Sequence, residues 1–316
     1  MPAKIVVVGS YNIDMTIKTA RIPQPGETII GGSFSMGAGG KGANQAVAAA
    51  RAGAEVWFIA RVGDDTFGDE ALQHLRRDGI NTDFMIRDKT APTGVASIVV
   101  DDDGENSIVV ASGANSHLQP GDVEAAKEVI AAADTVLLQL ESPLETVAAT
   151  AEMAAACGVA VVLNPAPAQT LTPTLLKFLS IITPNEVEAE MLTGIKIADE
   201  KSWEAAAQAL RTCGVANAMI ILGAQGVFVA TAQQKFLVPA FKVEAVDTTA
   251  AGDVFNGALA AFLSRDCSLG EAVRFACAAA AISVTKLGAQ ASAPARHEIQ
   301  KFLSHAQAAS TGGAKK

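Results

Sequence analysis

The chain has 316 residues, half of them hydrophobic, and its 33 acidic and 24 basic residues give a formal charge of −9. This length suits one large α/β domain, or a core with a small appendage. The negative charge and the low aromatic content of 5% argue against a surface that binds nucleic acid. A local cluster of backbone N–H groups with a few basic side chains can still bind a single nucleotide.

The N-terminal segment and the lengths of the apolar runs predict where the protein is located, and the cysteine spacing predicts the state of the thiols. Residues 1–9 carry one lysine and an apolar run too short for a signal peptide, and no small-residue cleavage site follows. No apolar run approaches the length of a membrane span. Cys157, Cys213, Cys267 and Cys277 form no C-x-x-C pair, so we expect buried free thiols. We therefore expect a cytoplasmic protein with no membrane partner.

Short aliphatic runs alternate with helical stretches along the chain. Strands are predicted over residues 5–9, 56–62, 135–140, 159–163, 180–183 and 219–222. Helices are predicted over residues 41–52, 67–78, 123–132, 144–157, 202–213, 253–264 and 269–287. This order, with nearly continuous apolar strands, is typical of a parallel sheet covered on both faces. The predicted fold class is therefore α/β, with a Rossmann-like, mostly parallel central sheet flanked by helices.

Two segments break this alternation. Residues 15–34 place two prolines and a glycine between β-prone runs, and residues 94–111 read as two strands joined by the turn Asp-Asp-Gly-Glu. Segments of about residues 12–38 and 94–112 are thus predicted to form a small separate sheet within one domain over residues 1–305. Residues 306–316 are rich in Ala, Ser, Gly and Lys, and are predicted to be a disordered tail.

Residues 246–263 combine a turn of small residues with the start of an apolar helix. The helix is predicted to begin near Gly252 and Asp253. Its unpaired N–H groups, together with the small residues Ala250 and Ala251, suit an anion that approaches the backbone closely. Asp253 would compete with a phosphate for these donors, so we interpret it as a general base beside a transferred phosphoryl group. The alternative is that Asp253 only caps the helix.

Residues 37–46 form a second glycine-rich motif. They contain G-x-G-x-x-G but no Walker loop, because Gly42 follows Lys41 where Ser or Thr is required. A dinucleotide site would need a preceding buried strand and an acidic residue about 20 positions later, where this chain has Val62. The glycines instead suit a sugar lying against the backbone, with Lys41 and Asn44 donating to its hydroxyls.

Both motifs resemble those of the ribokinase (PfkB) family of sugar kinases. Residues 247–253, Asp-Thr-Thr-Ala-Ala-Gly-Asp, are similar to its C-terminal signature, although many members have Gly in place of Ala250. Residues 39–46, Gly-Gly-Lys-Gly-Ala-Asn-Gln-Ala, match its N-terminal signature residue for residue. The resemblance covers about residues 4–303. It implies a ribokinase-like fold in which the small sheet is a lid that covers the sugar and often pairs with a second subunit, so we expect a homodimer.

The resemblance also assigns the sugar-binding residues. Asn12 and Asp14 follow the first strand, at the sheet edge where ligands bind, and would contact O2 and O3 of ribose; an ordinary polar loop is the alternative. An Asn that binds O2 argues against a 2-deoxyribose kinase. Glu141 ends the strand at residues 135–140 and is also assigned to the sugar, the alternative being an acid that caps the helix after Pro143. The remaining sugar-binding residues are Gly40, Lys41, Asn44 and Asp253.

The nucleotide site is implied by three further segments. Asn185 and Glu188 resemble the family's N-x-x-E motif, in which the Asn contacts phosphates and the Glu organises Mg²⁺ through water; an acidic first helical turn is the alternative. The turn of residues 222–226 resembles the loop that lies on the adenine and ribose of ATP. Its residues are Leu222, Gly223, Ala224, Gln225 and Gly226, and Gly252 joins them at the phosphates. Cys277 stands where ribokinases often present His or Asn to the nucleotide, so a backbone or packing contact with the nucleotide is expected there in place of a side-chain hydrogen bond.

A monovalent-cation site is implied beside the anion-binding turn. The ligands would be main-chain carbonyls together with the Asp247 carboxylate, and the ion, K⁺, would order the turn without touching the substrate. The residues assigned to it are Asp247, Thr249, Ser283, Lys286, Gly288 and Ser292.

The implied activity is transfer of the ATP γ-phosphoryl group to the 5-hydroxyl of D-ribose, giving D-ribose 5-phosphate and ADP. Asp253 would remove the hydroxyl proton while the N–H groups of Ala250, Ala251 and Gly252 hold the developing charge. The main alternative is a family kinase of another sugar or a nucleoside, such as 2-deoxyribose, fructose or adenosine, although the low aromatic content gives no obvious stack for a purine. A non-catalytic sugar sensor is a further alternative.

Overall fold

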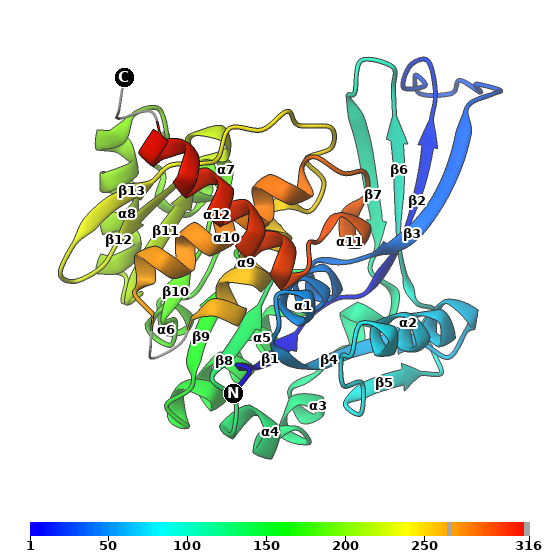
Figure 1. Ribbon diagram of the computed structural model, residues 1–316. Helices are drawn as coiled ribbons and strands as arrows, with labels where there is room; N and C mark the ends of the chain where they lie inside the picture. The colour runs from blue at the N-terminus through cyan, green and yellow to red at the C-terminus, as the bar shows by residue number, and fades with distance from the viewer. Residues whose placement is uncertain (264–266, 313–316) are drawn as a thin grey trace.

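The computed structural model describes residues 1–263 and 267–312, and it contains a nine-stranded sheet and a four-stranded sheet (Figure 1). Pairing from β11 to β5 is parallel throughout, and β12 and β13 add an antiparallel edge. The α/β class and the mostly parallel sheet are therefore confirmed. Across the large sheet the order is β13 (Lys235–Val238), β12 (Val227–Ala230), β11 (Asn217–Ile221), β10 (Ile181–Ile182), β9 (Ala160–Leu163), β8 (Thr135–Leu138), β1 (Lys4–Val8), β4 (Glu55–Gly63) and β5 (Met85–Asp88).

Helices cover both faces of the large sheet, because successive residues of its strands point to opposite sides. In β1, Ile5 and Val7 belong to one buried cluster, and Val6 and Val8 to the other. The first cluster is covered by α1 (Lys41–Arg51), α2 (Thr66–Arg77), α9 (Ala251–Phe262), α10 (Leu269–Ser283) and α12 (Arg296–Gly312). The second is covered by α3 (Pro120–Glu124), α4 (Lys127–Ala131), α5 (Leu144–Ala156), α6 (Pro173–Lys177), α7 (Glu186–Thr193) and α8 (Glu200–Thr212). Among the described helices none could cross a bilayer, being too short or too polar.

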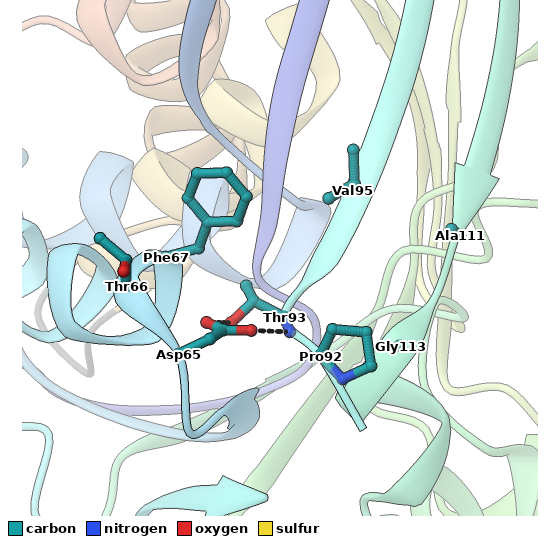
Figure 2. Close-up of a pocket in the computed structure, with 8 residues that line it drawn as sticks. All are labelled: Asp65, Thr66, Phe67, Pro92, Thr93, Val95, Ala111 and Gly113. Carbon is teal, nitrogen blue, oxygen red and sulfur yellow. Dashed lines mark hydrogen bonds between the residues drawn. The ribbon is translucent and has the colours of Figure 1, made fainter. Parts of the chain in front are cut away.

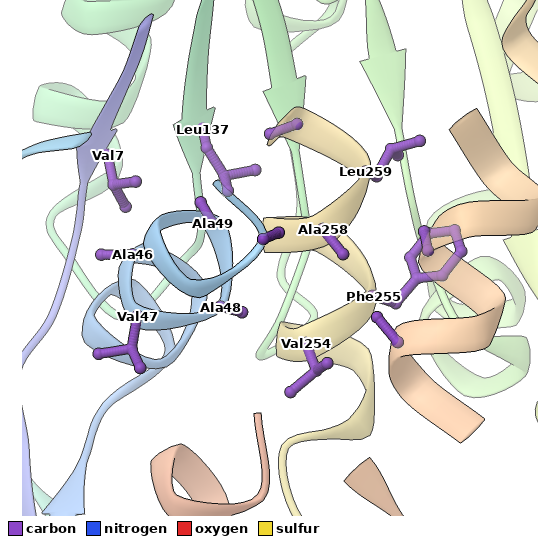
Figure 3. Close-up of a cluster of buried hydrophobic side chains, with 14 of the residues drawn as sticks. Val7, Ala46, Val47, Ala48, Ala49, Leu137, Val254, Phe255, Ala258 and Leu259 are labelled. Atoms are coloured by element: carbon purple, nitrogen blue, oxygen red, sulfur yellow. The ribbon is translucent and has the colours of Figure 1, made fainter. Parts of the chain in front are cut away.

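Helices α1 and α9 pack against each other through small residues (Figure 3). A Cβ atom at Gly257 would lie 2.4 Å from the carbonyl oxygen of Gln45 and 2.7 Å from Cβ of Ala48. No real side chain fits at such distances, so this close approach requires glycine. The approach brings the first turn of α1 beside the first turn of α9.

The small sheet, called the lid below, projects from one end of the large sheet (Figure 1). Its pairs β3–β2 and β6–β7 are antiparallel, whereas β2 and β6 run parallel. The strands lie within the two segments predicted for it, apart from the last residue of β3. Their order is β3 (Ser33–Gly39), β2 (Asn12–Lys18), β6 (Gly94–Val100) and β7 (Asn106–Ala111).

Asp65 anchors the base of the lid to α2 (Figure 2). Its carboxylate accepts from the N–H of Gly68, 2.8 Å away, and so caps α2. It also accepts from the N–H and the hydroxyl of Thr93, at 2.8 and 2.7 Å. Thr93 directly precedes β6, and an apolar cavity of about 380 Å³ between Phe67 and Val95 lies beside this anchor. The Asp65 carboxylate therefore links the start of α2 to the base of the lid.

Several boundaries differ from the predictions. The helix predicted over residues 123–132 is two short helices, α3 and α4, and the one predicted over residues 269–287 ends at Ser283. Helix α12 continues to Gly312, so it covers much of the tail predicted to be disordered; Ala and Gln in this segment are good helix formers. Residue 264 of the helix predicted over residues 253–264, and residues 313–316 of the tail, lie outside the described residues.

Candidate active site

The candidate site lies where neighbouring parallel strands end. Ser10, Gln139, Asn164 and Thr183 follow β1, β8, β9 and β10 within two residues, and all four side chains are buried. Parallel strands end at one edge of a sheet, so these polar groups gather there. The first turns of α1 and α9 meet this edge.

Asp253, in the first turn of α9, is held by two amides of α1. Asn44 Nδ2 donates to its Oδ2 at 3.0 Å, and Gln45 Nε2 donates to its Oδ1 at 2.9 Å. The residue is 5% exposed, yet it lines a cavity of about 420 Å³. Predicted residues that line the same cavity are Lys41, Asn185, Glu188, Gly223, Ala250, Ala251 and Gly252. Asp253 is therefore placed to act on a molecule in that cavity rather than only to cap its helix.

The turn before Asp253 has an unusual backbone. Ala250 has φ of 57°, and no other non-glycine residue in ranges 1–263 and 267–312 has a positive φ. Its carbonyl accepts from the N–H of Val254 at 2.8 Å, which starts α9. The N–H of Ala251 donates to the carbonyl of Thr248 at 3.2 Å, so this predicted anion donor has a partner within the turn.

Lys41 lies among four carboxylates. The carboxylate of Asp253 raises the pKa of Lys41 most, against the opposing effect of burial, and Glu141, Glu188 and Asp14 add to the increase. Burial raises the pKa of Glu188, although Lys41 opposes that shift. Lys41 therefore stays positively charged and offsets part of the negative charge around the cavity.

Asn185 and Glu188 also form a capping box at the start of α7. Glu188 N–H donates to Oδ1 of Asn185 at 2.8 Å, and Asn185 N–H donates to Oε2 of Glu188 at 2.9 Å. The alternative of an acidic first helical turn thus describes their contacts within the chain, in which the two residues cap α7. Both residues still line the cavity with Asp253, so a ligand role stays a prediction.

On the sugar side, Glu141 caps α1 and not the helix after Pro143. Its Oε2 accepts from the N–H of Lys41 at 3.0 Å and from Oγ of Ser10 at 2.5 Å. Glu141 and Asn12 line a second cavity of about 340 Å³. Glu141 contacts Lys41, which lines the cavity beside Asp253, so the two cavities are neighbours.

Asp14 and Gly40 lie close to Lys41 and Glu141. The pKa of Asp14 is raised to about 6, mainly by burial and also by the carboxylates of Glu141 and Asp253, while Lys41 opposes the increase. Gly40 precedes α1 with φ of 87°, and a Cβ atom there would lie 2.7 Å from the backbone nitrogen of Asn12. Glycine is therefore required at residue 40, where β2, β3 and α1 meet.

Three buried polar atoms at the site make no hydrogen bond within the described part of the chain. One is Gln139 Oε1, and the other two are Asn44 Oδ1 and Ser142 Oγ. Ser142 lines the cavity with Asn12 and Glu141. Buried polar atoms are rarely left unpaired, so Asn44 Oδ1 and Ser142 Oγ are available to ligand hydroxyls.

The predicted adenine loop is only partly at the cavity. Gly223 lines it, the side chain of Leu222 is buried in the core, and Ala224 and Gln225 are exposed. Gly226 has φ of 110°, and a Cβ atom there would meet the carbonyl of Val238 at 2.1 Å. Cys277 is buried in α10, which raises the pKa of its thiol to about 12, and it is not among the residues lining the described cavities. The expectation of buried thiols is wrong for Cys157 and Cys213, which follow the exposed ends of α5 and α8 and are exposed.

The two segments predicted to bind a cation do meet. Asp247 accepts from the N–H of Thr249 at 2.9 Å and from the N–H of Gly288 at 2.8 Å. Burial alone would raise the pKa of Asp247, but these hydrogen bonds hold it below its usual range. The side chain of Lys286 pairs with Glu298 at 3.1 Å, which leaves its carbonyl as the available group. Ser283 and Ser292 donate their hydroxyls to carbonyls three residues earlier.

Several residues of the site were not singled out from the sequence. Gln45 stands inside the glycine-rich motif, next to Asn44, and that position was the signal for it. Gln139 lies near the end of the strand predicted over residues 135–140, and Asn164 directly follows the strand predicted over residues 159–163. Asn115, in the 3₁₀ turn Gly113–His117, had no local signal, because its partners lie about a hundred residues earlier.

Comparison with known proteins decides the family. Residues 2–296 match the family described as pfkB family carbohydrate kinase. This chain belongs to that family. A ribokinase of Haemophilus influenzae is 48% identical over 306 residues, covering 97% of this chain and 100% of that protein. A deoxyribokinase of Salmonella typhimurium is 38% identical over 301 residues, covering 95% of this chain and 98% of that protein.

A solved structure supports the same assignment. Arabidopsis thaliana ribokinase, complexed with ribose and ATP, matches this pfkB-family chain with a TM-score of 0.90 at 32% identity. The match covers 96% of this chain and 98% of that one. The chain is therefore a carbohydrate kinase with the ribokinase fold.

Proposed function

We propose that this kinase transfers the γ-phosphoryl group of ATP to the 5-hydroxyl of D-ribose, giving D-ribose 5-phosphate and ADP. The full-length similarity to proteins named ribokinase supports the substrate. The observation that carries the chemistry is the Asp253 carboxylate, which lines the larger cavity while Asn44 and Gln45 hold its two oxygens.

In this proposal the residues have distinct tasks. Asp253 accepts the proton of the attacking hydroxyl as its oxygen bonds to phosphorus. The N–H groups of Ala250 and Gly252 stabilise charge on the transferred group, with the positive end of α9 behind them. The N–H of Ala251 joins them by sharing its proton between the transferred group and the carbonyl of Thr248. Lys41 supplies a positive charge between the two cavities. Asn12 offers its NH₂ group to the sugar, because its side-chain oxygen already accepts a hydrogen bond from Asn115.

The proposal includes two metal ions. Glu188 lies near the carboxylate of Asp253, and a divalent ion that keeps its waters would offset their charge beside the phosphates. Mg²⁺ would be organised by Glu188 through water, while Asn185 contacts the phosphates. K⁺ would be held by carbonyls of the segment 283–292 and by Asp247, whose carboxylate already joins that segment to the anion-binding turn. Mg²⁺ would neutralise phosphate charge and K⁺ would order the turn.

The lid suits pairing with a second copy of the chain. The strand register places Ile17, Phe34, Met36 and Val109 on the face opposite to Asp14, and all four are exposed. We expect a homodimer that becomes monomeric in Val109→Lys and persists in Asn106→Lys, measured by sedimentation velocity. A native protein that sediments as a monomer at tens of micromolar would remove this part of the proposal. The expected location is the cytoplasm, where ATP is supplied.

A substrate panel tests the proposed activity. Phosphorylation rates for ribose, 2-deoxyribose, fructose and adenosine are measured side by side with ATP and Mg²⁺. We expect ribose to give the highest kcat/KM. A higher value for another acceptor would reassign the substrate, and absence of turnover with every acceptor would favour a sugar sensor.

A further inference from the structure

A row of buried amide side chains lies behind Asp253. Gln139 Nε2 donates to Oε1 of Gln45 at 2.6 Å. Gln45 Nε2 donates to Oδ1 of Asp253 at 2.9 Å and to Oδ1 of Asn164 at 3.1 Å. Asn164 Nδ2 in turn donates to the carbonyl of Thr183 at 3.3 Å. The row joins α1 and α9 to residues that follow β8, β9 and β10.

The structure of the amide group determines which side chain donates and which accepts in each hydrogen bond of this row. A primary amide carries its oxygen and its NH₂ group on opposite sides of one carbon. Because Gln139 donates to the oxygen of Gln45, the NH₂ group of Gln45 faces the other way, toward Asp253 and Asn164. Both N–H protons of Gln45 are then donated in hydrogen bonds, one to Asp253 and one to Asn164. Gln45 is completely buried, so it has no water with which to exchange these bonds.

We propose that Gln45 is a positioning residue for Asp253, fixing the plane of its carboxylate so that a lone pair faces the hydroxyl to be deprotonated. The inference rests on the proposed role of Asp253 as the general base. Gln45 is not among the residues lining either cavity of the described site, so it acts through Asp253 and not through the substrate. Asn44 holds the other carboxylate oxygen.

Gln45→Met tests this role, because methionine has a similar length and cannot hydrogen-bond to the carboxylate. We expect kcat to fall about 10-fold or more, while KM for ribose and ATP changes by less than about twofold. Ribose affinity measured by calorimetry should stay equally constant. A raised KM with unchanged kcat would overturn the proposal, since Gln45 would then shape the sugar site.

A double-mutant cycle separates positioning from a general loss of structure. In the Asp253→Asn background there is no carboxylate to orient, so adding Gln45→Met should lower the residual turnover by less than about threefold. Equal losses in both backgrounds would overturn the proposal. Failure of the base assignment looks different, because Asp253→Asn alone would then keep most of its turnover.

A second variant serves if Gln45→Met does not fold. Gln139→Met removes only the donor that sets the direction of Gln45 and leaves the contact with Asp253 in place. A smaller fall in kcat, about threefold, at unchanged KM supports the proposal. An unchanged kcat overturns it.

Discussion

Asn115 Nδ2 donates a hydrogen bond to Oδ1 of Asn12 at 2.8 Å, although the two residues are 103 positions apart. The same Asn115 side chain pairs with both backbone groups of Tyr11, at 2.9 Å each. The oxygen of Asn12 is therefore occupied, and its NH₂ group is left for the ligand. A sugar hydroxyl that accepts from Asn12 is favoured by this arrangement.

Asn115→Ala should weaken the preference for ribose over 2-deoxyribose. Loss of the donor frees the Asn12 amide to rotate, and a hydrogen bond to O2 worth about 1 kcal/mol corresponds to about a fivefold change in kcat/KM. The measurement is the ratio of kcat/KM for the two sugars. Ser116→Ala, at the next residue of the same cavity, is the matched control and should keep the ratio. An unchanged ratio in Asn115→Ala would show that Asn12 is oriented by other groups.

Ribose binding should strengthen as the pH rises through about 6, the pKa to which burial raises Asp14. The ionised carboxylate accepts from sugar hydroxyls, and below this pH it is protonated. Calorimetric titration between pH 5 and pH 8 checks this, with Asp14→Asn as the variant that lacks the dependence. A wild-type affinity that is flat over this range would contradict the assignment.

The raised pKa of Asp14 makes stability fall with rising pH, whereas ribose binding strengthens. Because the folded-state pKa of Asp14 lies above its ordinary value of 3.8, ionisation costs folding free energy. The free energy of unfolding of the wild type should therefore fall, relative to Asp14→Asn, as the pH rises from about 4 to about 6. Urea unfolding of both proteins across this range measures the difference. A difference that grows in favour of the wild type would be inconsistent with a raised pKa.

Ala250→Gly should stabilise the protein by about 1 kcal/mol, because Ala250 is held in the left-handed region where glycine has no steric cost. Turnover should be retained, since the turn contributes backbone groups. Ala261→Gly, inside α9, is the control and should destabilise by a similar amount. Chemical denaturation compares the three proteins, and a destabilised Ala250→Gly would mean that the turn carries no such strain.

Asp247→Ala should remove activation by K⁺ and lower the free energy of unfolding by about 1 kcal/mol, because the exposed N–H groups of Thr249 and Gly288 exchange a carboxylate acceptor for water. Rates are measured in KCl and in tetramethylammonium chloride at equal ionic strength. A variant that still responds to K⁺ would place the cation elsewhere.

The local motifs were readable from the sequence, whereas the contacts between them were not. The alternation of apolar runs predicted the parallel sheet, and the turn at residues 102–105 predicted the pairing of β6 with β7. The parallel pairing of β2 with β6 and the bond between Gln45 and Asp253, 208 residues apart, depend on tertiary packing. Gly257 is an example: it lies in an apolar helix pattern, and only the approach of α1 shows why glycine is needed there.

The most direct test of the account is the turnover of Asp253→Asn, measured together with its affinity for ribose. If Asp253 is the general base, kcat falls by about 100-fold or more while ribose still binds with nearly the wild-type affinity. A variant that keeps most of its turnover would contradict the account.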